Sequence, residues 1–259
     1  MPTEAGMEKI HVDLLALLKK FHKLCMGNGI KYSLHGGSLL GAVREKGFIP
    51  WDDDADVTMT RREYDKLKLL FGEKKQYENM IFDDQSALPT QIRMKNRKGE
   101  SVWLDIFIYD YVSENYLAYK LKVLGIAFFI CFAKTPQLIS FTKVGEYRGI
   151  RYYLVYMVYL FGKLFKHQAK LRWKTNFAIN AFTGSKKFMI RTNDQYRAIG
   201  LKISKQAIDS YTVVPFEDTE LMIHAGYDEI LKSSYGDNYM KPVRMADIFA
   251  HVHNEMKKW

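Results

Sequence analysis

The spacing of apolar residues predicts a long helix near the start of the chain. Between residues 7 and 26 the apolar positions recur every three or four residues, and they are Ile10, Leu14, Leu17, Leu18, Phe21 and Cys25. This period corresponds to one face of an α-helix. Lysines gather toward the end of the segment, where the helix dipole favours cations, and Asn28-Gly29 is a typical stop signal. We therefore expect a helix over residues 7–26.

The following segments alternate between strand and helix patterns without a strict repeat. Residues 30–34 alternate apolar and polar side chains, as in a strand, and Gly36-Gly37 then indicates a turn before a helix over 38–44. Further elements are expected as strands at 57–59, 90–95 and 101–109 and as helices at 61–71 and 227–235. Because strands and helices interleave irregularly, we assign an α+β fold with a mixed β-sheet core and flanking helices.

Charge and aromatic content divide the chain into three parts. The 259 residues carry a formal net charge of +10, and 17 Lys and Arg stand against two acidic residues between positions 117 and 205. The same stretch holds 17 of the 37 aromatic residues, whereas the remainder of the chain has a net charge of −5. We expect a core over 1–116, a basic, aromatic and mostly helical insert over 117–205, and a segment over 206–259 that returns to the core. Turns are expected at Thr135-Pro136, Gly145 and Gly184.

Composition limits the functional classes. The basic excess indicates an anionic partner, such as a phosphate, a nucleotide, nucleic acid or a membrane surface. Cys25 and Cys131 alone cannot build a disulfide framework or a four-ligand zinc site, which fits a reducing compartment. The first 20 residues lack the uninterrupted apolar run of a secretory signal. The longest uncharged apolar runs have 11 residues, whereas a membrane-spanning helix needs about 20.

The first candidate binding feature is Gly36-Gly37-Ser38, between a strand and a helix. Small residues there allow a phosphate to approach the backbone, and the start of a helix offers free amides and a positive dipole end. An ordinary tight turn before a helix has the same composition, so this feature alone does not decide between the two interpretations.

The second feature is the acidic run Asp52-Asp53-Asp54-Ala55-Asp56. If it is extended, Asp52, Asp54 and Asp56 share one face, since alternate side chains of a strand point the same way. Carboxylates packed in this way repel one another unless a cation lies between them. Such a site suits Mg²⁺ or Mn²⁺, which bind one or two carboxylates together with substrate phosphates. The competing interpretation is a solvated acidic loop.

The third feature is a single carboxylate, Asp105, inside the apolar run Val102 to Ile108. A buried carboxylate requires a compensating partner, because desolvation of its charge costs several kcal/mol. A metal ion would compensate it, and so would a buried arginine or backbone amides.

Other side chains near these motifs have weaker signals. Arg44, Lys46 and Arg93 are candidate phosphate clamps, although ordinary surface cations have the same appearance. Trp51 would either stack on a base or a quaternary ammonium group or, as isolated tryptophans more often do, pack beside the aspartate strand. We assign no role to three histidines, which are His35, His224 and His251.

Together these segments resemble the signature of the LicD family, which includes the fukutin-related glycan phosphotransferases and belongs to the nucleotidyltransferase-fold superfamily. The resemblance rests on residues 33–57, SLHGGSLLGAVREKGFIPWDDDADV, and on WLDIF at 103–107. Weaker similarities follow at 215–217, 226–227, 235–237 and 239–240. The resemblance extends over about residues 7–110 and 205–255 and leaves the basic insert undefined.

By position, the resemblance implies catalytic and metal-binding roles for Asp54 and Asp56, with Asp105 as the third carboxylate. It also implies that Gly37 and Ser38 hold the donor phosphates and that Asp52 acts in the outer sphere of the metal. The residues leave two roles open for Asp105, which would either complete a second metal position or accept a proton from the acceptor hydroxyl. The nucleotidyltransferase-like core would therefore hold Mg²⁺ or Mn²⁺ as cofactor.

The reaction implied by the resemblance is transfer of a phospho-alcohol, typically phosphocholine from CDP-choline, to a hydroxyl of a cell-surface glycan or its lipid-linked precursor, with release of CMP. Some relatives use CDP-ribitol. One alternative keeps the fold and the metal but uses an NTP and releases pyrophosphate. Another is a non-catalytic module that binds membrane or nucleic acid. We expect no nucleic-acid partner, because no RNP, KH or helix-turn-helix pattern is recognisable.

The basic, aromatic insert has two interpretations. Helices with apolar faces and flanking Lys and Arg lie in membrane interfaces, and residues 117–134 and 151–172 fit this description. Alternatively, the helices pack on the core while their cations bind donor phosphates. Because acceptors in this family are often built on lipid carriers, we expect a cytoplasmic protein with peripheral attachment to the cytoplasmic membrane through residues 117–172.

Overall fold

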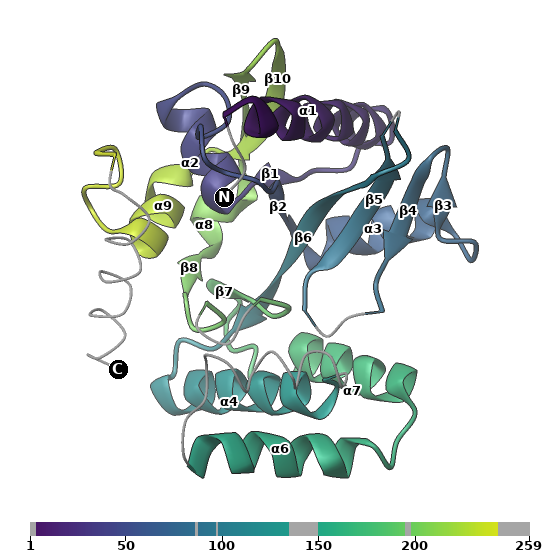
Figure 1. Cartoon of the computed structure of the whole chain (residues 1–259). Coiled ribbons are helices and arrows are strands. Elements are labelled where there is room, and N and C mark those ends of the chain that lie inside the picture. Colours follow the sequence, from purple (N-terminus) through teal and green to yellow (C-terminus); the bar gives the residue numbers. More distant parts are fainter. Residues whose placement is uncertain (1–3, 86–87, 97, 135–149, 195–197, 243–259) are drawn as a thin grey trace.

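The computed structural model describes residues 4–85, 88–96, 98–134, 150–194 and 198–242. Within these residues the central feature is a mixed sheet of eight strands (Figure 1). Six of them follow the spatial order β1 (Ser33–Leu34), β2 (Asp56–Thr60), β6 (Ser101–Val112), β5 (Thr90–Lys95), β4 (Met80–Asp83) and β3 (Gln76–Tyr77). Strands β2 and β6 are parallel, whereas the other pairs are antiparallel. Together with the flanking helices, this sheet confirms the predicted α+β fold.

The long strand β6 organises the sheet, because three strands pair with it. Strand β7 (Phe188–Arg191) pairs with its end, and β8 (Ile203–Ser204) pairs with β7. Tyr109 has both Thr60 of β2 and Arg191 of β7 as partners, so β7 and β2 lie on opposite edges of β6. Strands β5 and β7 therefore follow one another along the same edge.

A side chain fills the gap between β5 and β7. The Asn193 amide accepts a hydrogen bond from the Ile108 backbone N–H and donates one to the Ile106 carbonyl, at 2.7 and 2.8 Å. Between the ends of β5 and β7, where neither strand pairs with β6, the Asn193 side chain thus makes the hydrogen bonds that a neighbouring strand would make. The chain that returns after residue 180 is tied in this way to the centre of the sheet.

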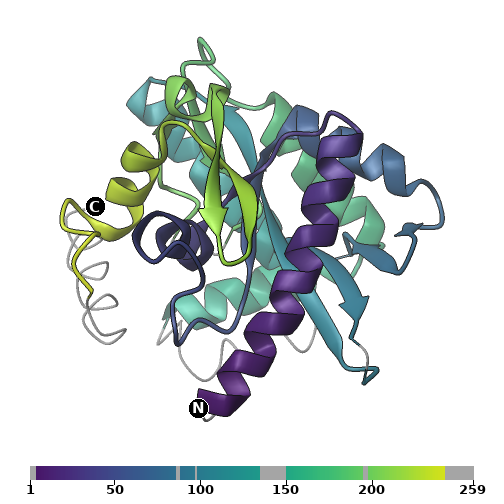
Figure 2. The same cartoon turned by 90° about the horizontal axis from the view of Figure 1, so that it is seen from above.

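Helices cover both faces of the sheet. Helix α3 (Arg61–Phe71) and helix α7 (His167–Asn180) lie on the face of β6 that carries Ile106, Ile108 and Asp110. Helix α2 (Gly36–Arg44) lies on the face that carries Asp105, beside helix α9 (Tyr227–Tyr235), as Figure 2 shows. The two faces of β6 therefore have different helical neighbours.

The remaining elements close the core. Helix α1 (Glu4–Gly27) buries Leu17, Leu18 and Phe21 completely and contacts β6 and β10. The hairpin of β9 (Tyr211–Phe216) and β10 (Thr219–His224) forms a separate two-stranded sheet beside β1, where the Ser33 hydroxyl accepts a hydrogen bond from the His224 backbone N–H. The short helix α8 (Lys205–Asp209) connects β8 to this hairpin.

A helical layer extends from one end of the sheet. It consists of α4 (Tyr116–Phe132), α6 (Ile150–Gly162) and α7, with α6 outermost in Figure 1. A second apolar cluster joins α4 to the sheet through Val112 of β6 and Ile190 of β7. In the part of the chain that the structure describes, every helix is too short or too polar to cross a membrane.

Several predicted elements match closely, and others need correction. The helices at 61–71 and 227–235 and the strand at 90–95 have the predicted bounds. Helix α2 begins at Gly36, so the two glycines form its first turn and do not precede it. The predicted strand over 30–34 is reduced to two residues, Ser33 and Leu34.

The stretch 117–205 is not helical throughout. Strands β7 and β8 lie within it and belong to the central sheet, so its helical part ends at Asn180. Gly184 does form a turn, with φ of +60°. The turns predicted at Thr135-Pro136 and Gly145 lie outside the described residues.

Candidate active site

Two carboxylates face each other across the parallel pair of strands. Asp56 is the first residue of β2, and it is the direct partner of Asp105 in β6. Side chains at paired positions of neighbouring strands lie on the same face of the sheet, and the strands are about 4.8 Å apart. Asp52 and Asp54 lie in the extended segment that leads into β2. The structure therefore brings four of the predicted aspartates to one edge of the sheet.

The first turn of α2 leaves room for these carboxylates. A Cβ atom on Gly37 would lie 2.1 Å from Asp52 Oδ2, and one on Gly36 would lie 2.8 Å from Asp56 Oδ2. The Ser38 hydroxyl accepts a hydrogen bond from the Asp56 backbone N–H at 3.1 Å, which fixes the start of β2 against the helix. Because the first amides of a helix lack intrahelical acceptors, this end of α2 can also receive a phosphate.

Burial and mutual repulsion raise the pKa of each of the four carboxyl groups. Loss of hydration, followed by the charge of Asp54, raises the pKa of Asp52 to about 7. Loss of hydration and the charge of Asp53 raise the pKa of Asp54. One oxygen of Asp52, Oδ2, is buried and has no hydrogen-bond partner among the described residues. Ionisation of these groups in the folded protein therefore has an energetic cost, which a bound cation would reduce.

The innermost group of the cluster is Asp56. Burial raises its pKa well above the usual range, and the charges of Asp54, Asp105 and Asp52 act in the same direction. Burial also raises the pKa of Asp105, against the effect of a hydrogen bond from Gln91. The chemistry of this donor set fits Mg²⁺ or Mn²⁺. Within the described residues, however, no three His, Cys, Asp or Glu side chains already stand in a metal-holding arrangement.

The predicted arginines take different positions. Arg93 donates to the Gln91 side-chain oxygen at 2.6 Å, and Gln91 in turn donates to Asp105 Oδ1 at 2.8 Å. The Arg93 charge thus lies at the rim of the carboxylate cluster, where it partly offsets the rise in the pKa of Asp105 that burial causes. Arg44 is at the other end of α2, about 12 Å along the helix from Gly36, and donates to Glu45. The structure does not bring Arg44 to the aspartates.

Trp51 is not a core residue. Its surface is 48% exposed, so the expectation that it lies in the core is wrong. Trp51 directly precedes Asp52 in the chain, and part of its surface is accessible to solvent. Stacking on a ligand base or on a quaternary ammonium group is therefore sterically open to it.

Sequence reasoning missed a layer of polar groups beneath the aspartates. Tyr235 of α9 places its hydroxyl 3.9 Å from the position of a Gly36 Cβ atom, and burial, with the charges of Asp52 and Asp56, raises its pKa. Arg191 donates through Nε to Asp194 at 2.5 Å, and both side chains are almost fully buried. The Asp194 charge contributes to the raised pKa of Asp56. Arg191 and Asp194 gave no sequence signal, because the pair comes from the compositionally basic stretch.

His35 also belongs to this layer. It precedes α2, its ring lies against Phe107 at 5.1 Å between centroids, and its backbone N–H donates to the Asp56 carbonyl. Burial and the charge of Arg191 lower its pKa well below the usual range, so the imidazole is neutral. His224 is buried nearby and hydrogen-bonds Thr58 of β2, while His251 lies outside the described residues. His35 and His224 thus both form hydrogen bonds with β2, the strand that begins at Asp56.

The raised pKa of Asp52 predicts a pH dependence of stability. Between about pH 4 and 7 the folded state holds a proton on Asp52 that the unfolded state has lost, so this group makes stability fall as pH rises. In metal-free buffer we expect Asp52→Asn to gain roughly 2 kcal/mol over the wild type between pH 5 and 8. Urea unfolding of both proteins at each pH gives the difference between their free energies of unfolding. His35 and His224 contribute in the opposite direction, but equally in both proteins, so their contributions cancel in this difference. A constant difference across this range would contradict the prediction.

The positive φ of Gly36 predicts a costly substitution. Its φ is +55°, and a Cβ atom would press on Asp56. We expect Gly36→Ala to lower the free energy of unfolding by about 1–2 kcal/mol and to displace the Asp56 carboxylate. Gly27→Ala is the matched control, because a Cβ there meets no heavy atom within 4 Å. Denaturant unfolding of both variants is the test, and equal stabilities would exclude the proposed strain.

Comparison with known proteins agrees with this geometry. Residues 29–130, which contain the glycine turn and all four aspartates, match the LicD/FKTN/FKRP nucleotidyltransferase domain. The chain is also 30% identical, over 88% of its own length and 88% of the other's, to the lipopolysaccharide cholinephosphotransferase LicD of Haemophilus influenzae. The chain belongs to the LicD family. It is an enzyme of the LicD type, a phosphotransferase, and this confirms the family resemblance of its motifs.

Shorter similarities extend to two uncharacterized proteins. An uncharacterized protein of Rickettsia typhi is 50% identical over 50 residues, which are 19% of this chain and 16% of the other. An uncharacterized protein of Rickettsia prowazekii is 50% identical over 46 residues, which are 18% and 17% of the two chains. In these two matches a short segment of the chain has 50% identity, whereas the match over 88% of the chain has 30%.

Proposed function

We propose that this LicD-type enzyme transfers phosphocholine from CDP-choline to a hydroxyl of lipopolysaccharide or a related glycan and releases CMP. The observation that carries the proposal is the 30% identity, over 88% of both chains, to a lipopolysaccharide cholinephosphotransferase. The four aspartates beside the start of α2, whose pKa values are all raised, support it, because a pyrophosphate donor needs both a cation and a phosphate-binding backbone.

The residues of the site have distinct proposed tasks. The first turn of α2, at Gly36, Gly37 and Ser38, would bind the donor phosphates, since small residues allow close approach. Asp54 and Asp56 would hold a divalent cation, with Asp52 in its outer sphere. The bound Mg²⁺ or Mn²⁺ would neutralise the pyrophosphate and stabilise the departing CMP. Because such ions take several ligands from substrate phosphates, the site would be completed only when the donor binds.

Asp105 has two proposed roles, as a general base or in a second metal position. Its pKa is raised, and Gln91 holds one of its oxygens, so the other can accept a proton from the acceptor hydroxyl. A role in a second metal position would use the same oxygen. The pH profile of the reaction distinguishes the two roles, because a base gives an acidic limb at its own pKa.

CMP release from CDP-choline tests the proposal directly. The full chain would be incubated with CDP-choline, a purified lipopolysaccharide acceptor and either Mg²⁺, Mn²⁺ or a chelator. We expect CMP and choline-labelled glycan only when a divalent ion and the acceptor are both present. CDP-ribitol and CTP serve as comparison donors. Release of CMP from CDP-ribitol alone, or of pyrophosphate from CTP, would overturn the phosphocholine assignment.

We propose further that the helical layer attaches the enzyme to the cytoplasmic membrane. The exposed side of α4 presents Leu117, Leu121, Leu124 and Phe128 at helical spacing. The outer side of α6 and the turn after it present Tyr153, Leu154, Met157, Phe161 and Leu164, each more than half exposed. Meanwhile, three lysines of α4 and α7 point inward and are buried: Lys122, Lys170 and Lys174. This inside-out pattern is typical of a surface that meets lipid.

Vesicle sedimentation tests the membrane proposal. We expect the protein to sediment with phosphatidylcholine–phosphatidylglycerol vesicles, because apolar side chains on α6 would enter the interface near basic flanks. The double variant Leu154→Glu/Met157→Glu should bind at least about tenfold more weakly. Leu69→Glu is the matched control, since Leu69 is 80% exposed on α3, away from this layer. Equal binding of all three proteins would contradict a membrane role for α6.

A further inference from the structure

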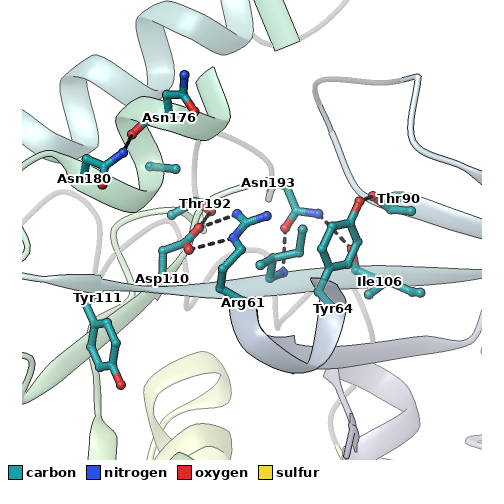
Figure 3. A network of polar contacts seen from close by, with 12 residues as sticks. Arg61, Tyr64, Thr90, Ile106, Asp110, Tyr111, Asn176, Asn180, Thr192 and Asn193 are labelled. Atoms are coloured by element: carbon teal, nitrogen blue, oxygen red, sulfur yellow. Dashed lines mark hydrogen bonds and ion pairs between the residues drawn. The ribbon is translucent and has the colours of Figure 1, made fainter. Parts of the chain in front are cut away.

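A polar cavity lies on the face of the sheet opposite the aspartates. Its volume is about 380 Å³, and it is bounded by α3, the β5–β6 pair and α7. Figure 3 shows part of its wall, with Arg61 and Tyr64 of α3 near Thr90 of β5 and Asn193, and with Asn176 on α7. Ile108 lines this cavity, whereas Asp105 points to the other face of the same strand. The cavity is therefore separate from the candidate active site.

Buried cations surround a single carboxylate behind this cavity. Asp110 accepts two hydrogen bonds from Arg61, at 2.9 Å from Nε and 2.6 Å from Nη2, and a third from the Thr192 hydroxyl. Lys174 is 6% exposed and lines the cavity. Lys122 is fully buried, and its ammonium donates to the carbonyls of Tyr111 and Ala178. Three cations thus share the charge of Asp110.

The mouth of the cavity adds further positive charge. Lys68 and Lys75 both pair with Asp84, and Arg172 is exposed at the rim with Asp65 on the opposite wall. Among the described residues in or directly behind the wall, six cationic side chains stand against three carboxylates. A cavity wall with a net positive charge attracts anions, so this excess of cationic side chains favours an anionic ligand.

The chemistry of the lining narrows the ligand class. Amides and hydroxyls dominate the uncharged part of the wall, including Gln85, Gln168, Thr175 and Asn176. Such groups bind hydroxyl-rich molecules, while arginine and lysine together suit the oxygens of a phosphate dianion. We propose that this cavity is a second binding site, which takes the phosphate group of a small, hydroxyl-bearing phosphomonoester through Lys174 and Arg172.

The ionisation of the two inner lysines is consistent with such a ligand. Burial, followed by the charge of Arg61, lowers the pKa of Lys174 to about 7. Burial lowers the pKa of Lys122 to about 8. An anion in the cavity would restore the protonated forms, since a nearby opposite charge favours the ionised state. The cavity is linked to the aspartate site by β6, whose two faces carry the two sites, and by β2, which begins at Asp56 and runs directly into α3.

Calorimetric titration of the full chain, in chelator and at constant ionic strength, tests the proposal. Inorganic phosphate, glycerol 3-phosphate and the short-chain lipid dihexanoyl phosphatidic acid are the three ligands. We expect glycerol 3-phosphate to bind more tightly than phosphate and to raise Tm by about 4 °C at ten times its dissociation constant. Tighter binding of the lipid than of glycerol 3-phosphate would overturn the proposed ligand class in favour of a headgroup.

Variants locate the binding site. Arg172→Gln changes an exposed side chain and should fold normally, yet it should weaken glycerol 3-phosphate binding about tenfold. Lys174→Met should weaken it at least as much, while leaving the free protein as stable or more stable than the wild type. Lys95→Gln, at an exposed lysine of β5, and Asp56→Asn should both bind like the wild type. Absence of binding, or undiminished binding in the first two variants, would overturn the proposal.

Discussion

The variant Asp56→Asn should lose about 10³-fold in kcat and yet unfold at a higher temperature than the wild type when metal is absent. Asp56 is the first residue of β2 and faces Asp105, and burial and four neighbouring carboxylates raise its pKa. The amide removes a desolvated negative charge, which should stabilise the metal-free fold by about 1–2 kcal/mol. In the proposed mechanism, the same change would also remove a charge that holds the divalent ion against the donor.

Three measurements separate these effects. Steady-state CMP release gives kcat, thermal unfolding in chelator gives the stability of the free protein, and unfolding in millimolar Mn²⁺ gives the stabilisation by metal. Asp53→Asn is the matched control, because Asp53 is exposed in the same segment. We expect it to keep both activity and stabilisation by Mn²⁺. A loss of stability in Asp56→Asn without metal would mean that Asp56 has a structural role.

The variant Arg191→Met should destabilise the protein by about 3–5 kcal/mol. Arg191 and Asp194 form a buried ion pair at 2.5 Å, with side chains 3% and 8% exposed. Removal of one partner leaves an uncompensated buried charge, which costs far more than the pair itself contributes. The Asp194 charge that remains would also raise the pKa of Asp56 further, since it already acts in that direction.

A double variant makes this prediction specific. In Arg191→Met/Asp194→Leu neither charge remains, so we expect at least half of the lost stability to return. Urea unfolding of the wild type, the single variants and the double variant gives the coupling free energy. If the double variant lost the sum of the two single losses, the destabilisation would come from packing and not from charge.

The predictions that rest on local sequence patterns were the most accurate. The bounds of α3 and α9 follow from apolar spacing and nearby breakers, and the structure confirms both. The glycine turn and the aspartate run are close in sequence, so their meeting at one edge of the sheet was predictable. The partnership of Asp56 with Asp105 spans about 50 residues, and only the family resemblance implied that the two carboxylates belong to one site.

The sequence did not predict contacts between residues that lie far apart in the chain. Tyr235 reaches the site because α9 packs beside α2, and nothing within either segment encodes that contact. Arg191 and Asp194 were hidden in a stretch whose composition indicated helices. Arg44 had the right chemistry, but the helical rise carries it to the far end of α2. For Tyr235, Arg191 and Asp194 the position depends on packing between distant elements and not on local propensity.

The late return of the chain to β6 has a consequence for the order of folding. One edge of this strand is completed only by β7 and by the Asn193 amide, about 80 residues further along the chain. Closing a loop of that length loses conformational entropy before the pairing of β7 with β6 contributes any favourable free energy. The sheet should therefore assemble slowly and late. Helices α4, α6 and α7 form the intervening loop, and a shortened chain that lacks them would need another connection of the same reach. During synthesis, this edge of β6 would therefore stay incomplete until helices α4, α6 and α7 have left the ribosome.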